Sequence, residues 1–254
     1  MFNLFQSNQM PLLVDAYTQR RSSTEATPFT PEIVLIQNHG MGQWLKLELA
    51  QHLGIAANIS AELPGTYITG LYHQFLRTPV EKESAYSRNI LTWHIMDVLT
   101  STQKSDRTSK RFLPLINYLE GEGDRDLRLY QLSHQLAGLY EQYLIYRPAW
   151  IQAWDKGSPG PMICQQHPWQ ALLWQEVKRR TDERHRANLH LELLDVIHSI
   201  NPIELPRRIS LFGFSSLPPM HFDTFRALAE KIEVDIYFLN PCQHYWGDIA
   251  SPKD

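Results

Sequence analysis

Residues 33–45 read IVLIQNHGMGQWL, and this stretch decides the fold class. Its first four residues, 33–36, form a continuous apolar run rich in β-branched side chains, which is typical of a strand buried on both faces. From Trp44 onward, apolar residues recur at helical spacing. A buried strand that leads into a helix is the repeating unit of an α/β fold with a parallel sheet. We predict a strand at 33–36, a turn at residues 37–42 that uses the two glycines, and then a helix.

The same alternation of strand and helix appears on both sides of this stretch. Ser7 or Asn8 is placed to cap a helix that runs to about Arg21. Near the other end, Pro218-Pro219 is placed to open a helix between two apolar runs. The further strands that we predict are residues 2–5, 209–212 and 234–239.

The middle of the chain has a different pattern. Between about residues 84 and 194, apolar side chains recur at helical spacing and are interrupted by polar or Gly/Pro-rich segments. The apolar faces consist of Leu91, Ile95, Val98 and Leu99, and of Leu132, Leu136, Leu139 and Tyr143; the interruptions are residues 101–110, 121–124 and 156–161. We predict an α/β domain (1–80 and 206–254) interrupted by an all-helical insertion (81–205). The chain ends soon after a strand, and a piece of a longer protein and a short tail are both compatible with this ending.

The composition is that of a globular protein. Of the 254 residues, 43% are hydrophobic and 20% are charged, which excludes a disordered chain. A net charge of −3 argues against a strongly basic, autonomous nucleic-acid binder but is compatible with a local basic channel. Cys164 and Cys242 are too few for a disulfide framework or a cysteine zinc site, and no apolar run approaches the roughly 18 residues of a membrane span. We expect a soluble, cytoplasmic protein with no membrane contact.

The loops after the predicted strands lack the residues of a nucleotide site. A phosphate loop needs the pattern G-x-x-x-x-G-K-[ST], but residues 6–10 contain no glycine and no lysine. Gly40 and Gly42 have the wrong spacing, and no acidic pair for Mg²⁺ follows the strand at 209–212. The sequence therefore predicts no ATP site, and an ATPase with an unusual phosphate loop is the rival hypothesis.

Other catalytic or metal sites find little support. Gly213-Phe214-Ser215 hints at the nucleophile elbow G-x-S-x-G, but Leu217 stands where a glycine is required. Three histidines, His185, His190 and His198, do not fit the metal spacing H-x-x-x-H. A stand-alone hydrolase that uses Ser215 stays an alternative, and so does a pure protein-interaction domain.

One local cluster is basic, and it lies beside aromatic residues. A positive groove lined with aromatics tracks a single nucleic-acid strand, whereas a solvated helix face gives the same composition. The sequence leaves both interpretations open. The cluster consists of Lys178, Arg179, Arg180, Arg184, His185 and Arg186, with Trp169 and Trp174 beside it.

Six short strings of unusual composition are spread along nearly the whole chain. They are residues 36–45 (IQNHGMGQWL), 54–59 (GIAANI), 142–148 (QYLIYRP), 185–189 (HRANL), 240–242 (NPC) and 245–249 (YWGDI). In content and order they resemble the RecC family, the gamma chain of exonuclease V. Members of that family are far longer, so the resemblance implies that this chain is an amino-terminal portion.

The resemblance implies a degenerate superfamily 1 helicase-like domain of the P-loop NTPase type, whose ATP site has decayed. It implies a DNA-binding, non-catalytic subunit of a RecBCD-type helicase–nuclease in double-strand-break repair and homologous recombination. Such a subunit holds RecB-like and RecD-like motor subunits, which carry the ATP and Mg²⁺, and it contacts single- and double-stranded DNA. Its channel receives the 3′-ended strand and recognises Chi.

The resemblance also carries over channel-lining positions. The amides of Gln37 and Gln43 would pair with base edges, Leu63 and Leu139 would pack against bases, and Arg147 and Arg186 would contact phosphates or bases. Glu141 stands where relatives carry Asp. The positions that depart are His39, Thr69 and Gly138, where relatives carry Thr, Trp and Asp. Without an aromatic side chain at Thr69, base stacking there and recognition of the same Chi octamer are in doubt.

Overall fold

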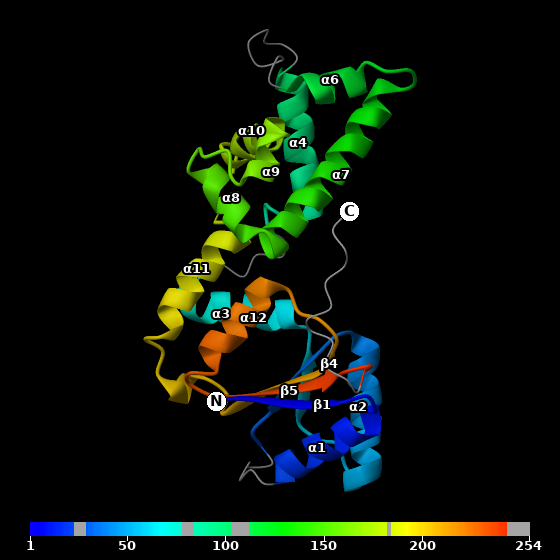
Figure 1. The fold of residues 1–254 in the computed structure, drawn as a ribbon, viewed down its shortest axis with the longest axis vertical. Helices are drawn as coiled ribbons and strands as arrows, with labels where there is room; N and C mark the ends of the chain where they lie inside the picture. Colours follow the sequence, from blue (N-terminus) through cyan, green and yellow to red (C-terminus); the bar gives the residue numbers. More distant parts are fainter. Residues whose placement is uncertain (23–28, 78–83, 103–111, 182–183, 243–254) are drawn as a thin grey trace. The chain divides into compact units, whose positions relative to one another are not determined.

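The computed structural model describes residues 1–22, 29–77, 84–102, 112–181 and 184–242. The chain divides into two compact units, one formed by residues 1–77 and 193–254 and the other by residues 78–192. The first is α/β and the second is helical (Figure 1). These limits differ somewhat from the predicted boundaries at 80/81 and 205/206, and the division into domains stays a prediction.

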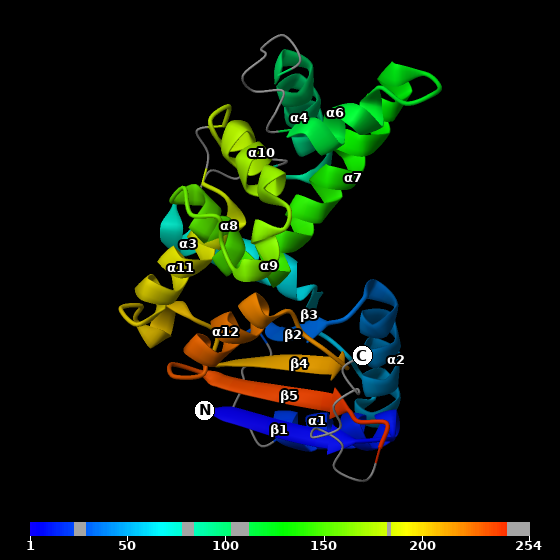
Figure 2. The ribbon, with the colours of Figure 1, turned by 45° about the horizontal axis from the view of Figure 1, so that its top comes forward.

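The α/β unit is built on one parallel sheet of five strands in the order β1-β5-β4-β2-β3. In Figure 2, the strands lie side by side and point in one direction. The α/β class with a parallel sheet is therefore confirmed, and each predicted strand lies within an observed one. The strands are β1 (Phe2–Ser7), β2 (Glu32–Ile36), β3 (Ile59–Glu62), β4 (Arg208–Phe214) and β5 (Glu233–Leu239).

Helices cover both faces of this sheet. The connections β1→β2 and β2→β3 run toward one edge of the sheet, and the connections that reach β4 and β5 run back. Right-handed crossovers in opposite directions place their helices on opposite faces. Accordingly α1 packs against α2 on one face, and α3 packs against α12 on the other (Figures 1 and 2). These helices are α1 (Met10–Ser22), α2 (His39–Leu53), α3 (Pro64–Leu76) and α12 (Pro219–Leu228).

The core between α1, α2 and the sheet is made of fully buried side chains. Tyr17, Phe212 and Tyr237 form edge-to-face and tilted ring contacts at its centre. Burying one large apolar side chain contributes about 1.5–3 kcal/mol, so this packing holds α1 and α2 firmly on the sheet. The other fully buried members are Leu13, Val14, Val34, Ile36, Leu45 and Leu49.

An ion-pair network joins α1 to the same face of the sheet. Arg20 contacts Glu233 at 3.0 Å and the fully buried Asp235 at 3.2 Å. Arg208, whose side chain is 8% exposed, contacts Glu32 at 2.7 Å and lies 4.0 Å from Asp235. The buried carboxylate of Asp235 is therefore balanced by two arginines, as a charge in an interior requires.

The turn predicted at residues 37–42 is wrong in its extent, because α2 begins at His39 and contains both glycines. Asn38 is the N-cap, and its side chain accepts a hydrogen bond from the backbone N–H of Met41 at 2.9 Å. A Cβ on Gly42 would lie 2.7 Å from Ile36 Cδ1 and 3.2 Å from Ala61 Cβ. Gly42 thus allows α2 to approach the sheet closely.

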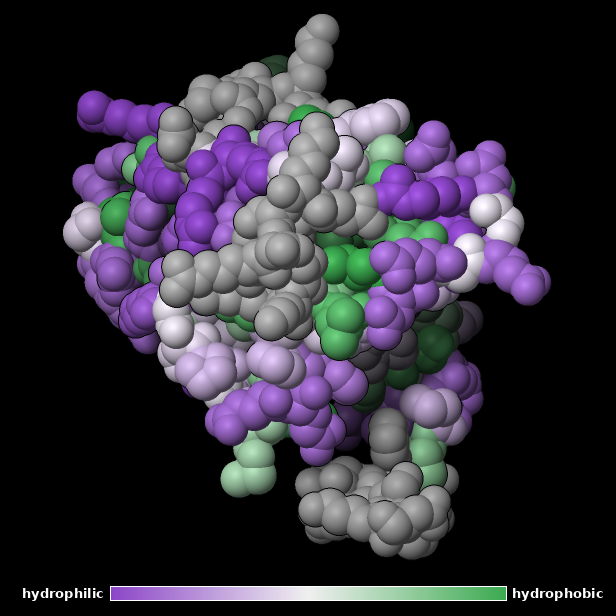
Figure 3. All heavy atoms as spheres, turned by 90° about the horizontal axis from the view of Figure 1, so that it is seen from above, coloured by the Kyte–Doolittle hydropathy of each residue, from purple (hydrophilic) through white to green (hydrophobic). Residues whose placement is uncertain are grey.

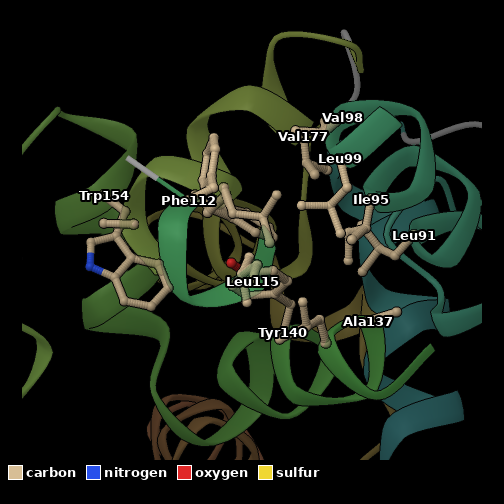
Figure 4. Close-up of a cluster of buried hydrophobic side chains, with 14 of the residues drawn as sticks. Leu91, Ile95, Val98, Leu99, Phe112, Leu115, Ala137, Tyr140, Trp154 and Val177 are labelled. Carbon is tan, nitrogen blue, oxygen red and sulfur yellow. The ribbon is translucent and has the colours of Figure 1, made fainter. Parts of the chain in front are cut away.

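The helical unit has a core of its own, shown in Figure 4. The predicted face of Leu91, Ile95, Val98 and Leu99 is fully buried there. On the second predicted face, Leu136 is buried and its other members are partly exposed. The helices are α4 (Arg88–Thr102), α6 (Leu113–Leu119), α7 (Arg125–Tyr146), α8 (Pro148–Asp155), α9 (Met162–Gln165) and α10 (Pro168–Lys178).

Two of the predicted interruptions separate helices as expected. Residues 121–124 lie between α6 and α7, where Asp124 caps α7, and residues 156–161 lie between α8 and α9. Most of the third, residues 103–110, lies outside the described residues. A further helix, α11 (Arg186–Ile197), begins in the helical unit and ends in the α/β unit, before a short turn, η2 (Pro202–Glu204).

Candidate nucleic-acid interface

The carboxyl edge of the sheet is where an α/β fold presents its functional loops. The strands β2 and β4 are neighbours, and the chain leaves them in opposite directions, toward β3 and toward β5. In open α/β sheets, ligands bind in the crevice that forms outside such a pair of strand ends. Residues 37–43 follow β2, and residues 215–218 follow β4, so both segments lie at this position.

Three of the predicted channel residues lie together on this edge. Gln37 lies in the two-residue link between β2 and α2, and His39 and Gln43 lie in the first turns of α2. All three side chains are exposed. The cap at Asn38 and the close approach at Gly42 fix the backbone that carries them. Two amides and an imidazole on a fixed backbone are able to donate and accept hydrogen bonds toward base edges.

Leu63 follows the strand next to β2, and Thr69 lies in the helix after it. Leu63 directly follows β3, the neighbour of β2, and it is the N-cap residue of α3. Its side chain is half-buried against the core of the sheet. Thr69 lies within α3, and its hydroxyl donates a hydrogen bond to the backbone oxygen of Gly65 at 2.8 Å. Leu63 therefore has only part of its surface available to a ligand, and the Thr69 hydroxyl is engaged in its own helix.

Two methionine side chains lie close to Gly213 near the end of β4. Gly213 has a φ of 74°, and a Cβ built on it would lie 3.1 Å from Met10 Cε and 3.1 Å from Met41 Cε. Met10 begins α1 after β1, and Met41 lies in the first turn of α2 after β2. Two apolar thioether side chains thus converge on Gly213 from the helices that follow β1 and β2.

Ser215 follows this point in the loop after β4. It is exposed, and it makes no hydrogen bond to a histidine in the part of the chain that the structure describes. An activated serine nucleophile needs a general base within hydrogen-bond reach. The geometry therefore gives no support to the hydrolase alternative.

In the helical unit, α7 carries the next group of predicted residues. Leu139 and Glu141 are half-buried on this helix, and Arg147 is its C-cap residue. The Arg147 side chain is exposed, and its guanidinium lies 5.4 Å from the ring centroid of Trp150, a cation–π contact. The guanidinium lies at the surface, and it has no ion pair with any other residue that the structure describes.

The last predicted residue, Arg186, opens α11 next to a buried cluster. The fully buried His185 lies 2.6 Å from Asp155 through its Nε2, and its Nδ1 accepts a hydrogen bond from the backbone N–H of Asn188. Trp174 Nε1 and Lys178 Nζ also donate to Asp155, each at 2.9 Å. Burial alone raises the pKa of Asp155, but hydrogen bonds from His185, Trp174 and Lys178 outweigh it and lower the pKa to about 2.

Of the two interpretations of the basic cluster, the contacts favour the solvated helix face over a groove lined by Trp169 and Trp174. Trp174 is fully buried, and most of the cations are paired with carboxylates. Among the described residues, Arg186 is the one arginine of the cluster with no ion pair. The pairs are Lys178–Asp155, Arg179–Glu176, Arg180–Asp97 and Arg184–Glu192.

Comparison with known proteins identifies the family. A family model described as RecC, N-terminal domain, matches residues 2–254. The chain belongs to the RecC family. It is 34% identical over 262 residues to the RecBCD enzyme subunit RecC of Escherichia coli (strain K12), an alignment that covers 99% of this chain and 23% of that protein.

Two further RecC relatives match at similar coverage. The subunit of Haemophilus influenzae is 33% identical over 276 residues, with 98% of this chain and 24% of that protein covered. The subunit of Mycolicibacterium smegmatis is 26% identical over 253 residues, with coverages of 99% and 22%. The chain thus spans about a quarter of the length of these RecC proteins. The family resemblance deduced from the six strings is confirmed, although the string at 245–249 lies outside the described residues.

Neither a metal centre nor a membrane helix is found in the described ranges. No group of three His, Cys, Asp or Glu side chains there is arranged to hold a metal ion. Likewise, none of the helices built from the described residues combines the length and the apolarity needed to cross a bilayer.

Sequence reasoning missed the residues that support Arg186. Asp155 lies 30 residues before His185, and no motif joins them. It also passed over Arg88, whose guanidinium lies over Gly138 so closely that a Cβ there would be 3.1 Å from Arg88 Nε. A histidine directly before an arginine at a helix start was the one local signal available, since such a histidine is placed to cap the helix.

Proposed function

We propose that this chain is the amino-terminal part of a DNA-binding, non-catalytic scaffold subunit of a RecBCD-type ATP-dependent helicase–nuclease. It acts in double-strand-break repair and homologous recombination, and it contributes to the channel in which the 3′-ended strand is read for Chi. One observation carries the proposal: in a member of the RecC family, Gln37, His39 and Gln43 are exposed together at the carboxyl edge of the sheet, on a backbone fixed by Asn38 and Gly42.

The proposal includes a helicase-like α/β domain that has lost its nucleotide site. The parallel sheet with helices on both faces supports this fold assignment. The lack of a glycine–lysine loop after β1 and of an acidic pair after β4 supports the loss of the site. Met10 and Met41 add a steric reason, because their side chains occupy the space above Gly213.

We assign the chemistry and the partners accordingly. ATP and Mg²⁺ belong to the RecB-like and RecD-like motor subunits, which this subunit holds in place in the cytoplasm. The chain itself supplies amides for base edges at Gln37 and Gln43, and guanidinium groups for phosphates at Arg147 and Arg186. The proposed strand contacts also include His39, Leu63, Thr69, Leu139 and Glu141.

Base readout by the two amides is tested in the assembled complex. The double variant Gln37→Ala/Gln43→Ala and the wild type are compared for the yield of Chi-dependent DNA fragments during unwinding. Each well-placed side chain–base pair is worth about 1–3 kcal/mol of discrimination, so we expect the Chi response to fall at least tenfold while unwinding continues. The control, Gln74→Ala, removes an exposed amide elsewhere in the α/β unit. An unchanged Chi response in the double variant would contradict the assignment.

The rival enzyme hypothesis has its own test. A chain that hydrolyses ATP by itself should bind nucleotide, and substitution of residues 7–10 should abolish the binding. We expect the isolated subunit to show no calorimetric heat with ATP and Mg²⁺. Binding that these substitutions abolish would reject the non-catalytic assignment.

A further inference from the structure

A row of exposed rings crosses the surface where α4 and α7 pack together. Trp93 on α4 is 64% exposed and Tyr130 on α7 is 44% exposed, and their ring centroids are 6.3 Å apart. The ring of Tyr130 is stacked on His134 at 5.9 Å with an interplanar angle of 13°. Large aromatic side chains exposed side by side mark binding surfaces more often than single exposed residues do. Hydrophobic side chains also reach the surface among hydrophilic ones on the face seen in Figure 3.

A planar cation continues this row. Arg88 is exposed at the start of α4, and its Nε donates a hydrogen bond to the backbone oxygen of His134 at 3.3 Å. Its guanidinium lies over Gly138, which offers no side chain to displace it. The two exposed rings, the half-buried ring of His134 and a guanidinium therefore follow one another where α4 and α7 pack together. We call this set, Trp93, Tyr130, His134 and Arg88, the aromatic strip.

The aromatic strip leads along α7 toward one of the proposed strand contacts, Glu141, whereas Leu139 lies on the opposite side of the helix. Tyr130, His134, Gly138 and Glu141 are spaced by four, four and three residues, which places them on one face of the helix. At 1.5 Å per residue, the rise from Tyr130 to Glu141 is roughly 16 Å. A stacked strand advances about 3.4 Å per nucleotide, so this face has the length of four or five nucleotides.

We propose that the aromatic strip is a base-stacking platform for single-stranded DNA that extends the proposed strand channel along α7. The chemistry favours a strand, because aromatic faces and an arginine plane stack on any base while the guanidinium charge meets phosphate. The four members of the strip carry no carboxylate, and Glu141 lies farther along the same face of α7. Leu127, which is 53% exposed, lies one turn before Tyr130 on the same face of α7. The location rests on the proposed function, and the stacking chemistry rests on the strip itself.

The test uses the full-length subunit assembled with its partner subunits, and an oligothymidine strand as the probe. Loss of one stacked base lowers affinity about tenfold, so Trp93→Ala should weaken binding by that factor and Trp93→Phe should restore most of it. Arg88→Ala should reduce the slope of log K against log salt by about 0.7, the value for one phosphate contact on a single strand. Strands with 5-iodouracil should cross-link to Trp93 or Tyr130 under ultraviolet light.

The matched control is Leu127→Ala, which removes an exposed aliphatic side chain from the same face of α7. Wild-type strand affinity for Trp93→Ala and Tyr130→Ala would overturn the proposal. So would Leu127→Ala weakening subunit assembly as much as Trp93→Ala does, because the strip would then be a protein-docking face. If Arg147→Ala and Arg186→Ala weaken binding while the strip variants do not, the proposed function stands and the platform alone is rejected.

Discussion

Replacing Asp155 by asparagine disrupts the buried cluster that holds the first turn of α11. The carboxylate accepts hydrogen bonds from His185, Trp174 and Lys178 at 2.6, 2.9 and 2.9 Å. Because His185 Nδ1 accepts the N–H of Asn188, its Nε2 is the donor toward Asp155. An asparagine offers one acceptor oxygen and turns an NH₂ group toward the remaining donors. At least one buried donor therefore loses its partner.

The size of the effect follows from the pKa and from the hydrogen bonds. The pKa of Asp155 is about 2 instead of its ordinary 3.8, and one unit corresponds to about 1.36 kcal/mol. The folded state thus favours the carboxylate by about 2 kcal/mol at neutral pH. A hydrogen bond to a charged group contributes about 1.5–3 kcal/mol. We expect Asp155→Asn to lower the free energy of unfolding by about 2–4 kcal/mol at pH 7.

Urea unfolding followed by tryptophan fluorescence measures this difference. The folded-state pKa lies below the unfolded-state value, so the stabilisation by the carboxylate is complete above about pH 5 and is lost as the pH falls through about 2. The gap between wild type and Asp155→Asn should therefore narrow by about 1 kcal/mol between pH 7 and pH 3. Equal unfolding free energies at pH 7, or a gap that does not narrow in acid, would refute the reasoning.

Three further substitutions probe the frame of the site. Gly213→Ala places a Cβ at a backbone position with positive φ, 3.1 Å from Met41 Cε. Urea unfolding should therefore show a free energy of unfolding that is about 1–3 kcal/mol lower. Wild-type stability would mean that the methionine is not held there. Arg208→Ala leaves the buried Asp235 with one cation fewer. In the same assay, we expect the free energy of unfolding to fall by about 3 kcal/mol. An unchanged free energy of unfolding would show that Asp235 does not need Arg208. Asp124→Ala removes the N-cap of α7. The free energy of unfolding should fall by about 1 kcal/mol, and amide hydrogen exchange in the first turn of α7 should become faster. Unchanged exchange would argue against the cap.

The strands of the sheet were predictable where burial requires a run of mostly apolar residues in the sequence. Residues 33–36 form a continuous apolar run, and residues 234–239 are apolar apart from Asp235; both segments become inner strands of the sheet. In contrast β3 reads ISAE, and it is an edge strand that pairs with β2 alone, so its two polar residues give no strand signal. The start of α2 was misplaced because glycines indicate turns, whereas at Gly42 the deciding factor is the distance to Ile36 in the sheet.

The sequence could predict where the site residues lie along the chain, but not which side chains surround them or pair with them. Gln37 and Gln43 were placed at a strand end by the strand–helix pattern, and the structure shows them exposed there. The sequence left the role of the basic cluster open because its neutralising partners are distant in sequence: Asp97 pairs with Arg180 from 83 residues away. Local charge counts contain no information on such pairs, so a cluster of cations in sequence is not yet a positive surface.

The most direct test of the central claim is the salt dependence of DNA binding by the assembled complex. Binding of a 3′-tailed duplex is measured between 50 and 200 mM salt for the wild type and for the double variant Arg147→Ala/Arg186→Ala. The control is Arg179→Ala/Arg184→Ala, because these two arginines are exposed but paired with carboxylates. If the first pair contacts phosphates of the strand, the slope of log K against log salt falls by about 1.4, at 0.7 per contact. We predict that fall for Arg147→Ala/Arg186→Ala and none for the control. Identical slopes and affinities for all three proteins would contradict the account.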